Sequence, residues 1–253
     1  MHEIETLKKF LNFPISSTAK IFDEFKNIDG HVFREKDTDG KERFLYIEGR
    51  LENKVLLVAH ADTYYDVCWD YPPKKHIVLH DGDFIKAVDK KGAPQLLGAD
   101  DRAGVAMLWL LKDSGHSLLI TDGEEHGQKG SEWLIKNNRD IAEKINFNHQ
   151  FMIQLDRKNK NDFKCYQVGT DEFRAFVKNK TGYKEPDKSS STDICVLCKN
   201  ICGVNFSVGY YNEHGCDEKL NVREWLNTYC MVKELLAEND LPKFLLHENF
   251  DII

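Results

Sequence analysis

The sequence contains no run of about 18 apolar residues, so it does not predict a membrane-spanning helix. Its first residues, MHEIETLKKFLNF, also lack the uninterrupted apolar stretch of a secretory signal. Seven cysteines are an odd number for a disulfide framework, and in a chain without such a signal they favour reduced thiols. From these absences we expect a cytoplasmic protein that has no membrane partner.

An excess of positive charge is absent as well, because 35 Lys and Arg residues stand against 42 Asp and Glu residues. Nucleic-acid-binding domains carry a basic face, so we expect no nucleic-acid partner. The chain also shows no internal repeat, no low-complexity linker and no break in composition. Its 253 residues, of which 41% are hydrophobic, suffice for one sizeable α/β core. We therefore expect a single domain over residues 1–253.

What the sequence does contain is an alternation of β-rich runs and helix-like segments. The run KVLLVAHAD, for example, predicts a strand over residues 55–59 that is buried on both faces. Further strands are expected at 31–34, 43–47, 151–156, 162–168 and 203–208, within HSLLIT, and as a hairpin in HIVLHDGDFIKAV. Helices are expected at 3–11, 18–27, 102–113, 129–138, 171–179, 191–199 and 222–238. This alternation predicts an α/β three-layer αβα sandwich with a mixed, mainly parallel central sheet.

Acids and histidines follow several of the expected strands. Ligands of open α/β sheets bind past the carboxyl ends of the strands, so side chains at these positions converge on one edge. The residues placed there, together with two acids before the helix at 102–113, are His60, Asp62, Asp100, Asp101, Asp122, Glu124, Glu125, Asp156, Glu213 and His214.

Such a cluster of acids is unstable without a counter-charge. Two like charges about 4 Å apart repel each other by about 4 kcal/mol at an effective dielectric constant of about 20. Either some of the carboxyl groups are protonated or a cation holds them together. Histidines in the same set favour zinc or a similar transition metal, because Ca²⁺ and Mg²⁺ prefer oxygen ligands alone.

Five short motifs occur in order along the chain: HAD at 60–62, GADDRAG at 98–104, DGEEHG at 122–127, LD at 155–156 and NEHGCDE at 212–218. Their order and rough spacing resemble those of the co-catalytic di-zinc exopeptidases. That superfamily includes peptidase T, carboxypeptidase G and the single-domain zinc aminopeptidases. The resemblance extends from Val55 to the region of Glu218, and LLGADDRAG is especially similar to the peptidase T form.

The resemblance implies two divalent metal ions, preferably zinc, with Co²⁺ or Mn²⁺ as alternatives. Asp100 would bridge the two ions. His60 and Asp156 would complete one site, and Glu125 and His214 would complete the other. A water molecule between the ions would become acidic enough to attack an amide carbon at neutral pH.

Three more residues receive roles from the same resemblance. Glu124 would be the general base that takes a proton from the water and passes it to the leaving amine. Asp62 would accept the free N–H of His60 and so fix the tautomer of that ring. Asp101 would lie outside the ligand set and be joined to Asp100 by a cis peptide bond.

Each candidate also has a plain structural interpretation. Asp100 or Asp101 suits the cap of the helix expected at 102–113, although a cap explains only one of the two acids. Glu124 and Glu125 suit a solvated turn. Because accidental placement of all five motifs in this order is improbable, we favour the metal site over these interpretations.

Several positions near the motifs stay open. Asp193 in SSSTD could orient the histidine of NEHGCDE or cap a helix, and the cap is the favoured interpretation. Glu213 or Asp66 could hold a substrate ammonium group. Cys195 and Cys198 have zinc-knuckle spacing but lack a second pair, so buried free thiols are expected. One of four tyrosines could stabilise the oxyanion: Tyr64, Tyr65, Tyr210 or Tyr211.

One departure from the family bears on the substrate. Many members insert a lid and dimerisation domain between the last two ligands, but the segment from Asp156 to His214 is too short for a domain of about 100 residues. We therefore expect no lid domain, and an aminopeptidase-type exopeptidase that cleaves short peptides. The oligomeric state stays open. The alternatives are hydrolysis of N-acyl amino acids, a non-catalytic metal-binding remnant, and glutaminyl-cyclase-like chemistry.

Overall fold

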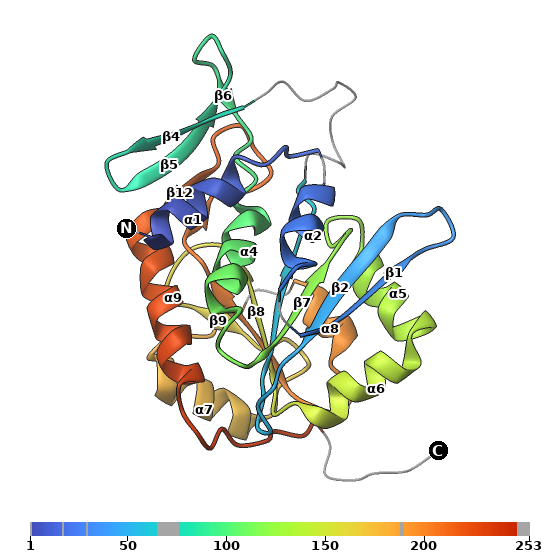
Figure 1. Ribbon diagram of the computed structural model, residues 1–253. Helices are drawn as coiled ribbons and strands as arrows, with labels where there is room; N and C mark the ends of the chain where they lie inside the picture. The colour runs from blue at the N-terminus through green and yellow to red at the C-terminus, as the bar shows by residue number, and fades with distance from the viewer. Residues whose placement is uncertain (1, 17, 29, 65–75, 188–189, 247–253) are drawn as a thin grey trace.

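A seven-stranded mixed sheet forms the middle layer of the molecule (Figure 1). The computed structural model describes residues 2–16, 18–28, 30–64, 76–187 and 190–246. The strands of this sheet are β1 (His31–Lys36), β2 (Glu42–Glu48), β3 (Leu56–His60), β7 (Ser117–Thr121), β8 (Met152–Arg157), β9 (Phe163–Lys164) and β10 (Gly203–Ser207). In the spatial order β1-β2-β7-β3-β8-β10-β9, the inner strands β7, β3, β8 and β10 are parallel. The outer strands run antiparallel to their neighbours.

Helices cover both faces of the central sheet. Successive residues of a strand point to opposite faces, so Leu57 and Ala59 of β3 join one apolar cluster and Leu56 and Val58 join the other. The first cluster also contains side chains of α1 (His2–Leu11), α2 (Ala19–Phe25), α4 (Ala99–Leu111), α7 (Asp171–Thr181) and α9 (Val222–Leu236). The second contains side chains of α5 (Lys129–Asn137), α6 (Arg139–Asn148) and α8 (Asp193–Leu197). The predicted three-layer αβα sandwich is confirmed.

A second, smaller antiparallel sheet lies beside the first, and part of it projects at the top of Figure 1. Its strands are β4 (Ile77–Asp81), β5 (Phe84–Val88), β6 (Pro94–Gln95), β11 (Tyr210–Tyr211) and β12 (Lys219–Asn221). The sequence predicted only the hairpin of β4 and β5, because strands of two or three residues are too short to show a periodicity. This sheet joins the segment before Asp100 to the two segments that flank His214.

The structure differs from the sequence prediction at one helix, which was missed, and at one strand, which is shorter than expected. The sequence did not predict α6, whose many charged and amide side chains obscure the apolar positions Ile141, Ala142 and Ile145. The strand expected at 162–168 is limited to Phe163–Lys164. It cannot continue, because Tyr166 adopts a φ of 49°, which is a left-handed conformation and not an extended one.

The start of α4 is irregular at the two adjacent acids. Asp100 (φ -78°, ψ 102°) and Asp101 (φ -118°, ψ 38°) are non-helical, so regular helix begins at Arg102, as the sequence predicted. The Asp101 Oδ1 atom accepts the N–H of Gly104 at 2.9 Å, which is the hydrogen bond of a helix cap. The capping interpretation therefore holds for Asp101, whereas Asp100 is left for another role.

Within the described ranges, no helix combines the length and the apolar character needed to cross a bilayer. The six cysteines in those ranges are free thiols. Cys198 is buried and Cys195 is partly buried, as expected for structural residues of the CVLC segment.

Candidate active site

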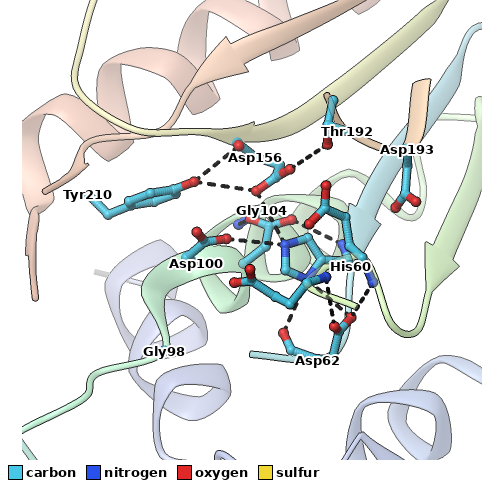
Figure 2. Close-up of polar contacts among 12 residues, drawn as sticks. His60, Asp62, Gly98, Asp100, Gly104, Asp156, Thr192, Asp193 and Tyr210 are labelled. Carbon is cyan, nitrogen blue, oxygen red and sulfur yellow. Dashed lines mark hydrogen bonds and ion pairs between the residues drawn. The ribbon is translucent and has the colours of Figure 1, made fainter. Parts of the chain in front are cut away.

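The carboxyl ends of neighbouring parallel strands bring the predicted site residues together (Figure 2). His60 is the last residue of β3, and Asp156 lies near the end of the adjacent β8. Glu125 follows β7, Asp100 comes from the start of α4, and His214 comes from the loop between β11 and β12. Four of these residues, all except His60, line one cavity of about 350 Å³. Residues that are scattered over most of the chain thus meet at one edge of the sheet.

Two groups of side chains form around Asp100. In the first, the His60 Nε2 atom lies 3.1 Å from Asp100 Oδ1 and 3.4 Å from Asp156 Oδ1. In the second, the His214 Nε2 atom lies 3.2 Å from Asp100 Oδ2 and 3.1 Å from Glu125 Oε1. Asp100 therefore presents one carboxylate oxygen to each group.

The donor atoms of both groups fit divalent metal ions. Each group offers one imidazole nitrogen and two carboxylate oxygens, which lie within 4.8 Å of one another. A tetrahedral zinc ion with ligands at about 2.0–2.2 Å needs ligand atoms about 3.3–3.6 Å apart, close to the observed separations. In addition, an imidazole Nε2 atom holds at most one hydrogen, yet each Nε2 atom here faces two carboxylates. A cation among the three atoms satisfies all of them.

Without a cation, the cluster holds more negative charge than its buried surroundings favour. Burial and the nearby Asp156 raise the pKa of Glu124 to about 9, and burial raises the pKa of Asp156 to about 7. Burial acts to lower the pKa of His214, but its contacts with Asp100 and Glu125 raise that pKa to about 10. The metal-free cluster therefore takes up protons near neutral pH, and a divalent ion would compete with those protons.

Asp62 holds both His60 and the acidic loop after β7. Its Oδ1 atom lies 3.3 Å from His60 Nδ1, and its two oxygens accept the N–H groups of Glu124 and Glu125 at 3.2 Å. Burial acts to raise the pKa of Asp62, but the neighbouring His60 lowers it to about 2. A charged Asp62 favours a hydrogen on His60 Nδ1, so Nε2 is the nitrogen that would bind a metal ion.

Asp101 lies behind the two groups and supports them through the backbone. Its carboxylate accepts the His60 N–H at 3.1 Å in addition to the Gly104 N–H. The peptide bond between Asp100 and Asp101 is cis, as the resemblance implied. A Cβ atom at Gly104 would lie 2.0 Å from the Leu155 carbonyl oxygen, so glycine allows α4 to approach β8 at this point.

His214 lies in the loop between β11 and β12, where its backbone has a φ of 66°. Its ring stacks on Tyr64, with ring centroids 4.0 Å apart and planes 12° apart. One of the four tyrosines considered for the oxyanion thus packs against a histidine of the site and helps to fix its orientation.

No protein-family model and no curated protein matches the sequence. Solved structures do match. The aminopeptidase PepT from Bacillus cereus has a TM-score of 0.63 at 14% identity, over 93% of this chain and 98% of that chain. A tripeptidase from Staphylococcus aureus has a TM-score of 0.62 at 12% identity, over 92% and 96%. A TET aminopeptidase from a Thaumarchaeota archaeon has a TM-score of 0.62 at 12% identity, over 95% and 97%.

This chain has the fold of these peptidases. The fold that the motif resemblance implied is therefore confirmed by structures that share little sequence with it. In this peptidase fold, the cavity lies past the carboxyl ends of the parallel strands, where ligands of open α/β sheets bind.

Asp156 is held by a set of polar side chains that the sequence did not predict. The Tyr210 hydroxyl lies 3.0 Å from the Asp156 carbonyl oxygen and 3.4 Å from its Oδ1 atom (Figure 2). Thr192 and Gln154 each donate to Asp156 Oδ2 at 2.9 Å, and Asn205 Oδ1 accepts the Asp156 N–H at 3.0 Å. Single polar residues such as these form no motif, although Tyr210 was a candidate for a different role.

Asp193 does not cap α8, although the cap was the favoured interpretation. Its buried carboxylate accepts hydrogen bonds from the hydroxyl groups of Thr121 and Ser131, and the cap position of α8 belongs to Thr192. Asp193 therefore connects α8 to β7 and α5 instead of capping its helix. The sequence does not reveal this role, because the two hydroxyl groups come from elements far away along the chain.

The remaining candidates for substrate contacts have partners within the chain. Glu213 forms an ion pair with Lys158, and both side chains line the cavity. The Tyr211 hydroxyl donates to Glu224 at 2.5 Å. Two further candidates, Tyr65 and Asp66, lie outside the described residues.

Proposed function

We propose that this protein is a metal-dependent exopeptidase of the aminopeptidase type that cleaves short peptides. The observation that carries the proposal is the pair of histidine–carboxylate groups that share Asp100 in the cavity of a peptidase fold. Asp100, His60 and Asp156 would hold one divalent ion, and Asp100, Glu125 and His214 would hold the other. Zinc suits these nitrogen and oxygen donors best, with Co²⁺ or Mn²⁺ as alternatives.

Ions bound there would supply Lewis acidity, which activates water and polarises the substrate carbonyl group. The protein's own contribution is to hold the ligands in place. Asp62 and Asp101 fix the ring and the backbone of His60. Tyr210 and Thr192 hold Asp156 by donating hydrogen bonds to its carbonyl oxygen and its carboxylate.

Glu124 is the general base of the proposal. Its side chain lines the cavity, while its backbone N–H is held by Asp62 Oδ1. Its carboxylate can accept a proton and release it again, which is the chemistry that a general base needs. In the reaction, Glu124 takes a proton from the attacking water and delivers it to the nitrogen of the leaving amine.

The size of the cavity favours a small substrate. A cavity of about 350 Å³ accommodates a few amino-acid residues and excludes a folded polypeptide. On its wall, the Glu213 carboxylate would have to exchange its ion pair with Lys158 for one with a substrate ammonium group. The choice of an aminopeptidase over a hydrolase of blocked peptides is supported by the fold that this chain shares with aminopeptidases and a tripeptidase.

A peptide-hydrolysis assay tests the proposal directly. Protein loaded with Zn²⁺, Co²⁺ or Mn²⁺ is incubated with a library of short peptides, and released N-terminal amino acids are measured. We expect release with at least one metal and none after treatment with a chelator. Cleavage of N-acyl amino acids without cleavage of free-amine peptides would select the amidohydrolase alternative. Folded protein that hydrolyses neither class with any metal contradicts the proposal.

The substitution Glu124→Gln tests the general base. It should lower kcat by about 10²–10⁴-fold, because the amide cannot accept the water proton. Metal content should stay unchanged, because Glu124 belongs to neither ligand group. Glu132→Gln, on the exposed side of α5, is the matched control and should change neither quantity. A non-catalytic remnant would instead show no difference between the two variants.

A further inference from the structure

Glu218 is a buried acid to which the proposed reaction assigns no role. It is the last residue of the motif NEHGCDE, four positions after His214, and only 1% of its surface is exposed. Burying a carboxyl group is unfavourable unless hydrogen bonds replace its lost hydration. The partners of Glu218 therefore indicate what it does.

The partners of Glu218 lie on the segment that leads into Asp100. Its Oε2 atom accepts the N–H groups of Leu97 at 3.0 Å and Gly98 at 2.7 Å, and its Oε1 atom accepts the N–H of Asp100 at 3.1 Å. Buried backbone N–H groups outside regular secondary structure need an acceptor from elsewhere in the chain. One side chain thus satisfies three backbone donors in the turn that precedes the regular part of α4 and fixes the conformation of that turn, which carries Asp100.

Glu218 also belongs to the segment that carries His214. Its N–H donates to the Gly215 carbonyl oxygen at 3.2 Å, which closes the loop after His214, and β12 begins at the next residue. Strand β12 pairs with β5, which in turn pairs with β6, the strand before Leu97. The Glu218 side chain therefore connects two segments that are far apart in the sequence and that supply Asp100 and His214.

We propose that Glu218 is a positioning residue that sets the separation of Asp100 from His214 and thereby the affinity of the site for divalent ions. The inference rests on the proposed function, because it assigns Asp100 and His214 to one metal site. Asp100 Oδ2 and His214 Nε2 lie 3.2 Å apart in a chain whose loops are already connected in this way. Ligands that are held in place before binding bind more tightly, since no chain segment has to be ordered at that moment.

A purely structural role for Glu218 would affect stability alone, and Asn146 offers a matched control. Its Oδ1 atom accepts the N–H groups of Lys199 at 2.8 Å and Asn200 at 3.0 Å, and its amide donates to two carbonyl oxygens. Asn146 is likewise buried and joins two distant segments, but its partners precede β10, at the end of the sheet away from the cavity. Asn146→Asp and Glu218→Gln both keep the size of the side chain. The first places a carboxylate oxygen against two backbone carbonyl oxygens, and the second places an amide NH₂ group against backbone N–H groups.

Zinc affinity, measured by competition with a chelator, is the first test. Glu218→Gln should weaken zinc binding by about 10–100-fold, the usual effect of removing a residue that orients a metal ligand. It should also change the visible absorption spectrum of the Co²⁺-loaded protein. Asn146→Asp should lower Tm without either change. If wild-type protein binds zinc and Glu218→Gln binds it with unchanged affinity and spectrum, the positioning role is overturned and the proposed function stands.

Backbone hydrogen exchange in the metal-free protein is the second test, and it does not depend on metal binding. Glu218→Gln should accelerate exchange in residues 97–104 and also in residues 212–217, whereas Asn146→Asp should affect neither segment. Acceleration confined to residues 97–100 would overturn the coupling between the two segments. Wild-type protein that binds no divalent ion would contradict the proposed function and the affinity part of this inference. The exchange result would still decide whether Glu218 connects the segments.

Discussion

Asp100 is the residue on which the site depends most, because its two oxygens face two different histidines. A helix cap at this position would contribute only about 1 kcal/mol of stability and would have no effect on metal binding. Because Asp100 belongs to both groups, its substitution should reduce metal binding more than substitution of a residue that belongs to one group. Asp100→Asn removes the charge from both groups, whereas Glu125→Gln removes charge from one group only.

We therefore expect wild-type protein to retain two zinc ions per chain after dialysis, Glu125→Gln to retain one, and Asp100→Asn to retain fewer than one. Metal content per chain, measured by elemental mass spectrometry, is the readout. Two retained ions in Asp100→Asn would contradict the bridging role of Asp100.

At the scale of elements, the close packing of α4 on β8 determines where the proposed metal ligands Asp100 and Asp156 lie. A Cβ atom at Gly104 would lie 2.0 Å from the Leu155 carbonyl oxygen and 2.5 Å from Asp101 Oδ1. Replacing an exposed glycine within a helix by alanine normally stabilises the protein by about 1 kcal/mol. Gly104→Ala should instead lower the free energy of unfolding by about 1–3 kcal/mol, because the added methyl group overpacks the contact.

Urea denaturation of Gly104→Ala tests this packing. Gly127→Ala is the control, since its Cβ atom would meet no atom within 4 Å and only its φ of 82° is unfavourable for alanine. We expect the loss at Gly104 to be the larger of the two. A Gly104→Ala protein that is as stable as wild type would show that α4 and β8 can separate without loss.

At the scale of the whole molecule, a buried neutral histidine affects how global stability depends on pH. His149 Nδ1 lies 2.8 Å from the Ile145 carbonyl oxygen, and its Nε2 atom lies 2.7 Å from Ser117 Oγ. A carbonyl oxygen only accepts, so Nδ1 carries the hydrogen and Nε2 accepts from the Ser117 hydroxyl. Burial lowers the pKa of His149 to about 3, so the ring is neutral in the folded protein.

The sign of the pH effect follows from the two pKa values. Unfolded His149 has a pKa of about 6.5, so below that pH the unfolded chain binds a proton that the folded chain does not. The free energy of unfolding therefore falls as the pH falls from about 6.5 towards 3, by up to about 1.4 kcal/mol per pH unit. Above that window His149 has no effect on the pH dependence.

The substitution His149→Gln removes this titration. Between about pH 6 and pH 5, the stability of the variant should decrease with falling pH by about 1 kcal/mol less than that of wild type. The free energy of unfolding of both metal-free proteins is measured with denaturant at each pH. The acids of the candidate site titrate equally in the two proteins, so their contribution drops out of the difference. Equal slopes for the two proteins would show that folding does not lower the pKa of His149.

The sequence by itself determined the fold class and the membership of the acidic cluster. Strands such as β3 were recognisable because both of their faces are apolar, and His60, Asp100, Glu125, Asp156 and His214 each lie in a motif of a few adjacent residues. These patterns involve only neighbouring residues, so they can be recognised in the sequence without the tertiary structure. The same locality explains why Asp101 was recognised as a possible cap.

Only the tertiary structure decided which residues support that cluster. The hydrogen bonds that Glu218 accepts from Leu97 and Gly98 join residues about 120 positions apart, and those that Asp193 accepts join residues more than 60 positions apart. The short strands β6, β11 and β12, which align the Asp100 and His214 segments, are too brief to leave a pattern. A local sequence pattern reports the preference of a chain segment for burial and secondary structure. The partner that satisfies a buried polar group is decided when distant segments pack together, because only then is that group removed from water.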